Sequence, residues 1–137
     1  MTGKFEIKVR PELIKNMLQH AYDSLPYEAC GIISGKKDKA VKFYPARNEL
    51  KSQSRYNINP DDLYRIIMDI EEKGLDIWGI FHSHPASPAY PSDTDLNQAF
   101  YPDAYYLIAS FMDEKNPGLR AFLIRDRRIL EVKIETD

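Results

Sequence analysis

The alternation of hydrophobic and polar residues predicts a strand and then a helix at the start of the chain. Residues 4–9 alternate with a period of two, which is typical of a strand with one buried face. Over residues 11–23, apolar side chains recur at helical spacing, and Pro11 suits the first helical turn. We interpret this apolar stripe as core, and His20, which lies off the stripe, as a solvated surface residue.

Two short apolar segments after this helix predict a β-hairpin. They cover residues 28–35 and 41–46, with a short charged turn between them. Glu28 stands at the mouth of the first strand, where a carboxylate is either an ordinary solvated strand end or part of a site. The polar residues 47–59 lack sustained periodicity and form the longest predicted loop.

The second half of the chain mixes helix and strand in the same way. Asn59 and Pro60 are typical of a helix start, and Gly74 terminates the apolar stripe that follows. The remaining predicted elements are a strand over residues 75–82, a short helix over about 92–100, and strands over 105–111, 119–125 and 129–134. Strands that flank helices in this order, without an internal repeat or a linker, predict one mixed α/β domain over residues 1–137.

Composition and charge narrow the classes of function. The 137 residues are 43% hydrophobic and 29% charged, which is the balance of a globular domain long enough to bury a core. A net charge of -2 argues against a general electrostatic grip on nucleic acid or on an anionic membrane. The N-terminus lacks the apolar segment of a signal peptide, and no run approaches the ~18 apolar residues of a membrane span. We therefore expect a cytoplasmic protein.

The strongest chemical signal is a pair of histidines, His82 and His84, at the C-terminal end of the predicted 75–82 strand. Residues two apart on a strand project from the same face, so both imidazoles point the same way. The pair alone is weak evidence, but Asp95 adds a carboxylate from the next element. Two nitrogens and one oxygen leave a fourth tetrahedral position for water, as in catalytic zinc sites. This mixed ligand set favours Zn²⁺ over magnesium or calcium, with iron and manganese as weaker alternatives.

The segment between the histidines and Asp95 carries two further expectations. Eight residue steps from His84 to Ser92 could stretch to ~26 Å, so the proline-rich segment 85–91 must double back. Ser92 and Asp95 also have the spacing of a capping box, although that box prefers Glu or Gln as its acid. Both roles are compatible, because the first turn of a helix is a rigid platform for a carboxylate and a hydroxyl.

Four separate parts of the sequence form one ordered pattern. In chain order they are Glu28, His82-Ser83-His84-Pro85, a spacer that ends at Pro91, and Ser92-x-x-Asp95. This pattern resembles the JAMM motif of the MPN+ metalloprotease family, and the short chain resembles its compact prokaryotic members. The matching parts span about half the chain, from residue 28 to residue 95.

The resemblance implies a fold, a cofactor and roles for named residues. The implied fold is a cytidine-deaminase-like α/β sandwich in which helices flank a mixed, curved sheet. The implied cofactor is Zn²⁺, held by His82, His84 and Asp95. Glu28 is then the general base, and Ser92 stabilises the tetrahedral intermediate. The implied reaction is hydrolysis of a peptide or isopeptide bond without a covalent enzyme intermediate.

The same resemblance suggests a partner for the site. MPN+ enzymes act on ubiquitin-like proteins, whose slender C-terminal tail can enter a groove as an added strand. The compact prokaryotic members imply a ubiquitin-like or sulfur-carrier protein as substrate. The 47–59 loop, with Arg55 and Tyr56, is the expected place for contacts with that tail. The sequence indicates neither the leaving group nor the oligomeric state.

Two alternatives to this enzyme remain open from the sequence. The first is a non-catalytic binding or scaffold module of the MPN type. The second is a closed structural metal site in which Cys30 joins His82, His84 and Asp95. Cys30 is the only cysteine, so it excludes a disulfide within the chain, and we interpret it as a buried core residue.

Overall fold

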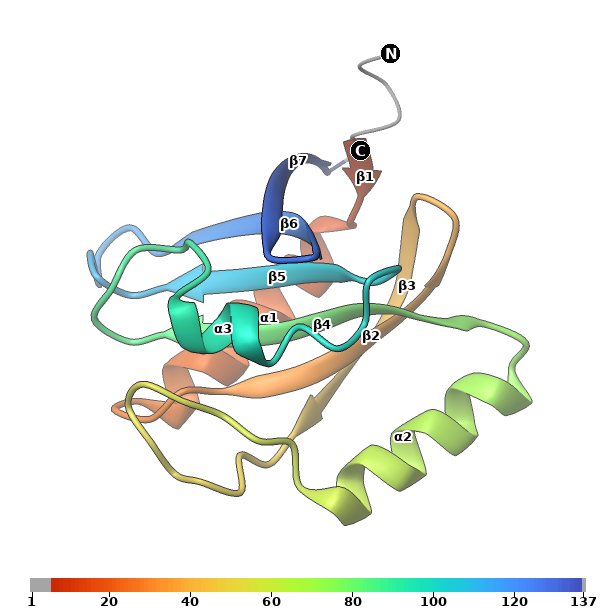
Figure 1. The fold of residues 1–137 in the computed structure, drawn as a ribbon, viewed down its shortest axis with the longest axis horizontal. Helices are drawn as coiled ribbons and strands as arrows, with labels where there is room; N and C mark the ends of the chain where they lie inside the picture. Colours follow the sequence, from red (N-terminus) through yellow and green to blue (C-terminus); the bar gives the residue numbers. More distant parts are fainter. Residues whose placement is uncertain (1–5, 137) are drawn as a thin grey trace.

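In the computed structural model, which describes residues 6–136, the strands pair into one mixed sheet that closes into a barrel (Figure 1). The strands are β1 (Glu6–Lys8), β2 (Cys30–Lys36), β3 (Lys39–Ala46), β4 (Asp76–His84), β5 (Tyr105–Ser110), β6 (Gly118–Arg125) and β7 (Arg128–Glu135). The helices are α1 (Pro11–Ser24), α2 (Pro60–Glu72) and α3 (Asp93–Asn97). Neighbouring strands follow the order β1-β3-β2-β4-β5-β6-β7.

The predicted elements are all present, although some of their ends differ. The strand predicted over residues 75–82 is β4, and it continues to His84 because that residue still pairs with Ser110 of β5. The short helix predicted to reach about residue 100 already ends at Asn97. The first two residues of the predicted 4–9 strand lie outside the described part of the chain.

The predicted mixed α/β class is confirmed, but the sequence does not predict that the sheet closes. β1 lies parallel to both of its neighbours, with Lys8 opposite Lys39 of β3 and Glu6 opposite Lys133 of β7. Three residues of β1 therefore join the two ends of the sheet. The cytidine-deaminase-like label and the curvature of the sheet stay predictions.

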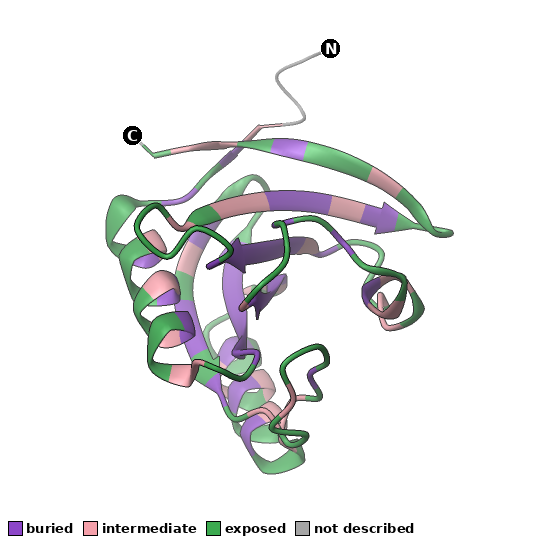
Figure 2. Ribbon diagram, turned by 90° about the vertical axis from the view of Figure 1, so that its left-hand side faces the viewer, coloured by how far each residue is buried: buried purple, intermediate pink, exposed green. Residues whose placement is uncertain are grey.

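Side chains that alternate along the central strands form two hydrophobic clusters. Ile33 and Phe81 pack with the buried face of α1, whereas Ile32 and Ile80 pack with the buried face of α2. Successive residues of a strand point to opposite faces, so α1 and α2 cover different sides of the sheet. Figure 2 shows buried residues concentrated on the central strands, while each helix keeps an exposed side. His82 follows Ile80 by two residues and therefore shares the face that α2 covers.

The interpretation of His20 as a solvated surface residue is wrong. The residue is half-buried, and its Nε2 atom lies 3.0 Å from the carbonyl oxygen of Cys30. Its ring also lies 5.9 Å from that of Phe43. Because α1 packs against β3, β4 and β5, a residue beside the apolar stripe still meets the sheet.

Between residues 6 and 136, no helix combines the length and the apolar character that crossing a membrane requires.

Candidate metal centre

The two histidines lie at the C-terminal end of β4, an interior strand of the sheet. β4 pairs with β2 on one side and with β5 on the other, so its backbone hydrogen bonds are made within the sheet. His82 stands opposite Cys30 of β2 and Ile108 of β5. His82 and His84 are only 1% and 3% exposed. Both imidazoles are therefore held in a dry environment.

The proline-rich connection after β4 doubles back, as predicted. The Nδ1 atom of His84 lies 2.7 Å from the carbonyl oxygen of Pro88, and Ser110 Oγ donates to the carbonyl of Ser87 at 2.6 Å. Because a carbonyl only accepts, Nδ1 of His84 carries a hydrogen, so in the neutral ring Nε2 is the nitrogen that has the lone pair. The return of the chain thus sets the tautomer that a metal ligand needs.

The first turn of α3 holds Asp95 in a capping box. Ser92 Oγ accepts a hydrogen bond from the Asp95 amide at 3.1 Å, and the Asp95 carboxylate accepts one from the Ser92 amide at 2.9 Å. The same Oδ2 atom lies 3.1 Å from His82 Nε2 and 3.0 Å from His84 Nε2. The capping role and the site role of Asp95 therefore coexist.

The three side chains fit a tetrahedral zinc ion. His82 Nε2 and His84 Nε2 lie 3.2 Å apart, and each is 3.0–3.1 Å from Asp95 Oδ2. Zinc bonds of 2.0–2.1 Å at the tetrahedral angle place neighbouring ligand atoms about 3.3 Å apart. Over residues 6–136, this is the only group of three His, Cys, Asp or Glu residues whose ligand atoms converge within 4.8 Å.

The contacts within this triad shift its pKa values in different directions. Burial alone would raise the pKa of Asp95, but the hydrogen bonds from His82 and His84 outweigh it and lower that pKa. Burial lowers the pKa of His82. For His84, burial is outweighed by the bonds to Asp95 and to the Pro88 carbonyl, and the pKa rises. The triad thus combines an anionic carboxylate with a neutral, buried His82.

Glu28 lies just before β2 and is not a solvated strand end. It is 3% exposed, and its Oε1 atom is buried without a hydrogen-bond partner. Burial is the main cause that raises its pKa to about 8, while the nearby His84 lowers this pKa and Asp95 raises it. Ala29, the next residue, is tied to β4, because its amide donates to Ser83 Oγ at 2.8 Å. The sheet therefore holds this carboxyl group beside the triad.

The 47–59 loop fixes the backbone of Glu28 from both sides. The Glu28 amide donates to the carbonyl of Ser52 at 2.7 Å, and its carbonyl accepts from Asn48 Nδ2 at 3.1 Å. Asn48 Nδ2 also donates to the Arg55 carbonyl, and Asn48 Oδ1 accepts from the amides of Leu50 and Asn57. The sequence does not single out Asn48, because an asparagine in a polar loop has no distinguishing pattern.

Tyr56 brings the same loop to the metal triad. Its ring stacks on that of His82 at 4.6 Å between centroids with an interplanar angle of 19°, and the residue is 8% exposed. The Nδ1 atom of His82 is buried without a hydrogen-bond partner. The stack on Tyr56, rather than a hydrogen bond to Nδ1, therefore holds the ring in place. Tyr56 thus packs against a site residue, while Arg55 is exposed, and contacts between this loop and a substrate tail stay a prediction.

Cys30 lies beside the centre but belongs to the core. It is fully buried in the cluster that α2 covers, and its Sγ atom faces the carbonyls of Ala46 at 3.8 Å and Arg47 at 3.5 Å. Burial raises its pKa to about 12, so the thiol stays protonated at neutral pH. Its Sγ atom is not among the converging ligand atoms of residues 6–136. The core interpretation is confirmed, and Cys30 does not supply the fourth ligand of a closed metal site.

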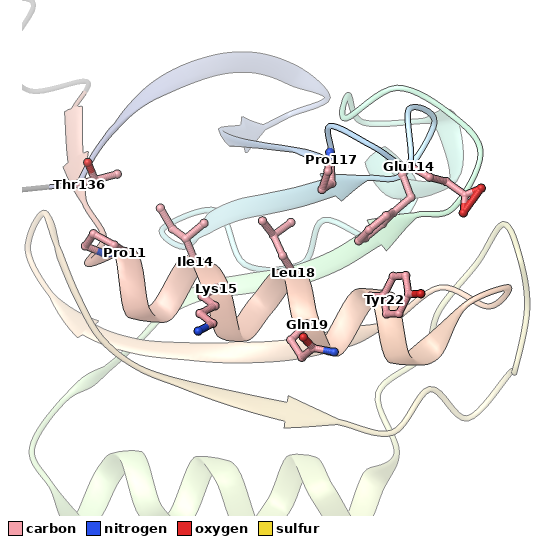
Figure 3. Close-up of a pocket in the computed structure, with 10 residues that line it drawn as sticks. Pro11, Ile14, Lys15, Leu18, Gln19, Tyr22, Glu114, Pro117 and Thr136 are labelled. Atoms are coloured by element: carbon pink, nitrogen blue, oxygen red, sulfur yellow. The ribbon is translucent and has the colours of Figure 1, made fainter.

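A surface hollow of about 580 Å³ lies elsewhere on the molecule (Figure 3). Ile14 and Leu18 of α1 line it together with Pro117, which precedes β6. None of the triad residues lines this hollow. This hollow is therefore separate from the triad at the end of β4.

Comparison with known proteins places this arrangement in context. The family described as prokaryotic homologs of the JAB domain matches residues 10–125. The CysO-cysteine peptidase of Mycobacterium tuberculosis is 31% identical over 129 residues, which cover 93% of this chain and 88% of that protein. The desampylase of Pyrococcus furiosus is 29% identical over 130 residues, which cover 95% of this chain and 91% of that protein.

A solved structure shows the same fold. The JAB1/MPN domain protein AF2198 from Archaeoglobus fulgidus superposes with a TM-score of 0.62 at 21% identity. The match covers 96% of this chain and 99% of the other. At this identity the likeness concerns the fold alone, and it extends over nearly the whole of both chains.

Proposed function

The chain belongs to the family of prokaryotic homologs of the JAB domain, and we propose that it is a zinc-dependent peptidase or isopeptidase. Its substrate in this proposal is the C-terminal tail of a ubiquitin-like or sulfur-carrier protein. One observation carries the chemistry: three ligand atoms converge beside a buried carboxyl group, that of Glu28, which has an unpartnered oxygen.

The metal ligands in this proposal are His82, His84 and Asp95. Their separations of 3.0–3.2 Å support a tetrahedral ion, and no fourth protein ligand converges with them among the described residues. A bound Zn²⁺ supplies an electrophile for the scissile carbonyl and a water of lowered pKa. The Pro88 carbonyl and the Tyr56 ring orient the two imidazoles toward that position.

Glu28 is the general base in this proposal. Its unpartnered carboxylate oxygen can accept the proton of the attacking water and then deliver it to the leaving amine. Burial raises the pKa of Glu28 to about 8, near neutral pH, which suits a group that must both take and return a proton. The hydrogen bonds from Asn48 and to Ser52 fix its backbone during both transfers.

Ser92 stabilises the tetrahedral intermediate in this proposal. Its oxygen already accepts the Asp95 amide, so its hydroxyl hydrogen is free to donate to a developing oxyanion. Ser92 is exposed at the start of α3, where a substrate carbonyl can reach it. The reaction therefore needs no nucleophilic side chain and no covalent intermediate.

The substrate class rests on the names of the relatives. One is a CysO-cysteine peptidase, one is a desampylase, and a third, from Thermus thermophilus, is a probable TtuB-protein conjugate cleaving protease. We assign this chain to the same kind of substrate, a small carrier protein whose extended tail ends in a cleavable adduct. An extended tail suits a centre that is buried at the end of a strand.

Intact-mass measurement of a carrier-protein conjugate tests this function. The zinc-loaded protein should release the adduct, and Glu28→Gln should lower the rate at least a hundredfold. Glu72→Gln is the matched control, because Glu72 is exposed on α2, and it should cleave like the wild type. Equal cleavage by wild type and Glu28→Gln would falsify the role of Glu28. Binding without cleavage by the wild type would favour the scaffold alternative.

Removal of the metal separates a catalytic site from a structural one. Chelation should abolish cleavage while circular dichroism and the unfolding midpoint change little, because two apolar clusters sustain the fold. A closed structural cage predicts the opposite, since such domains unfold when their metal is removed. Loss of the folded spectrum on chelation would therefore overturn the catalytic assignment of the metal.

A further inference from the structure

Ser110 lies at the C-terminal end of β5, next to a strand that carries two of the proposed metal ligands. It pairs with His84 in the parallel register of β4 and β5, so both side chains point to the same face of the sheet. The next residue, Phe111, donates its amide to the carbonyl of His84 at 3.1 Å. Ser110 is only 8% exposed. The end of β5 therefore holds the His84 backbone and adds a buried hydroxyl to the face that carries its ring.

The Ser110 hydroxyl both accepts and donates a hydrogen bond. Its oxygen accepts from the Met112 amide at 3.2 Å, and its hydrogen is donated to the carbonyl of Ser87 at 2.6 Å. Because that carbonyl only accepts, the single hydrogen of the hydroxyl must point toward it. Ser87 belongs to the proline-rich connection 85–91, which follows β4. The hydroxyl thus ties this connection to the end of β5.

The tie at Ser87 lies one residue before the carbonyl that orients His84. That carbonyl, of Pro88, accepts from Nδ1 of His84 at 2.7 Å and from the amide of Tyr90 at 2.8 Å. Peptide units are planar, and the ring of Pro88 fixes its φ angle. Only the ψ angle of Pro88 is therefore soft between the Ser87 carbonyl and the Pro88 carbonyl. Anchoring the first carbonyl limits the positions that are open to the second.

The rest of the 85–91 connection is held by contacts that do not involve Ser110. Ala89 is buried in the hydrophobic cluster that α2 covers, and the ring of Tyr90 meets that of Phe122 edge-on at 5.5 Å between centroids. These apolar contacts keep the segment on the sheet when the hydroxyl is removed. Loss of the hydroxyl should therefore loosen the start of the connection without releasing all of it.

We propose that Ser110 is a positioning residue for the metal centre, and that its hydroxyl raises zinc affinity by fixing the Pro88 carbonyl against the ring of His84. The inference rests on the proposed function and extends it to a residue outside the four-part sequence pattern. Groups that orient a histidine ligand through its second nitrogen typically contribute about 10–100-fold to metal affinity. Without the hydroxyl, both the Pro88 carbonyl and the imidazole gain freedom, so zinc binding must first order them.

Zinc titration of the metal-free protein against a chromophoric chelator tests this role without requiring turnover. Ser110→Ala should bind zinc at least fivefold more weakly than the wild type. Ser110→Thr and Ser110→Val form a matched pair, because their side chains have nearly the same shape and differ in the hydroxyl. The threonine variant should bind zinc at least fivefold more tightly than the valine variant. A smaller difference in either comparison would overturn the proposal.

Ser34→Ala is the control for this titration. Ser34 is fully buried on β2 and pairs with Ile77 near the start of β4, so its replacement should leave zinc affinity unchanged. Titrations are made at a temperature where every variant is folded by circular dichroism. If the larger side chains at position 110 prevent folding, the comparison of Ser110→Ala with the wild type decides alone.

NMR of selectively labelled histidine separates this role from a general loss of stability. The Nδ1–H group of His84 faces the Pro88 carbonyl, and its signal is identified by its absence from His84→Gln. In Ser110→Ala this hydrogen should exchange with water at least fivefold faster than in the wild type. The Nε2–H group of His20, which faces the carbonyl of Cys30, should exchange at an unchanged rate. Unchanged exchange at His84, or equal acceleration at both histidines, would overturn the proposal.

The role of Ser110 and the proposed function can fail separately. Weaker zinc binding by Ser110→Ala, with no conjugate cleaved by the wild type, would overturn the hydrolase and keep the role of Ser110. Cleavage by the wild type, together with unchanged zinc affinity in Ser110→Ala, would keep the hydrolase and overturn that role. Where both hold, Ser110→Ala should need at least fivefold more free zinc than the wild type for half-maximal cleavage.

Discussion

Replacing Asn48 by alanine removes the side chain that ties the 47–59 loop to Glu28. Its Nδ2 atom donates to the carbonyls of Glu28 and Arg55, and its Oδ1 atom accepts from the amides of Leu50 and Asn57. One amide thus uses both its donor and its acceptor side on backbone groups. The variant loosens the loop but changes neither the proposed metal ligands nor Glu28 itself.

The expected loss of stability is moderate. An intramolecular hydrogen bond contributes about 1 kcal/mol net. Three of the four bonds of Asn48 are exposed, where water can replace the lost partner, and only the bond to Glu28 is partly buried. We expect Asn48→Ala to lower the free energy of unfolding by about 1–3 kcal/mol. The melting temperature should then fall by roughly 3–9 °C.

The expected loss of activity is larger than this change in stability suggests. Without Asn48, the bond from the Glu28 amide to Ser52 is the remaining tie between the loop and the Glu28 backbone. A displacement of about 1 Å at a catalytic group can lower the rate about a hundredfold. We expect kcat to fall about 10–100-fold at a temperature where the variant is folded, with KM changed less than about threefold.

Asn48→Asp and Asn16→Ala complete this experiment. Aspartate keeps the acceptor oxygen for Leu50 and Asn57 but cannot donate to Glu28, so its kcat should fall as far as that of Asn48→Ala. Asn16 is exposed on α1, and its replacement should leave both kcat and melting temperature near wild type. Steady-state kinetics and thermal unfolding check both. A kcat within twofold of wild type in folded Asn48→Ala would refute the positioning argument.

Two further predictions concern buried titratable groups. Burial raises the pKa of Glu28 from 4.5 to about 8, so between these pH values the folded, metal-free protein binds more protons than the unfolded chain. The unfolding free energy of the chelated protein should therefore fall as pH rises through this window, and Glu28→Gln should flatten the slope; urea titrations at several pH values check this. Cys30, whose burial raises its pKa to about 12, should react with a thiol reagent only after denaturation, and Cys30→Ala should keep one zinc ion per chain by elemental analysis.

The triad could be predicted from the sequence because each of its parts is local. His82 and His84 share a face through the period of two along a strand, and β4 continues through both. Ser92 and Asp95 form their capping box within one helical turn. Local geometry of this kind is the same in any fold that contains the element, so spacing indicates which side chains within one element point together.

The setting of Glu28 could not be predicted in the same way. Its burial depends on the register of β2 against β4, which places Cys30 opposite His82, and on the bond from Ala29 to Ser83. The closure of the sheet through β1 likewise depends on pairing with β7, at the other end of the chain. Contacts between distant segments leave no periodic trace in the sequence.

The aperiodic 47–59 loop joins the parts of the site to one another. Asn48 holds the backbone of Glu28, Tyr56 packs against His82, and Arg47 pairs with the buried Asp62 at the start of α2. Tyr56 and Ile58 attach the loop to the hydrophobic cluster that α2 covers, and the polar contacts of Asn48 and Arg47 hold much of the rest. Such segments open at lower free energy than the strands around them. A loop that positions the proposed base and a proposed ligand ring therefore makes activity more sensitive than folding to substitutions within it.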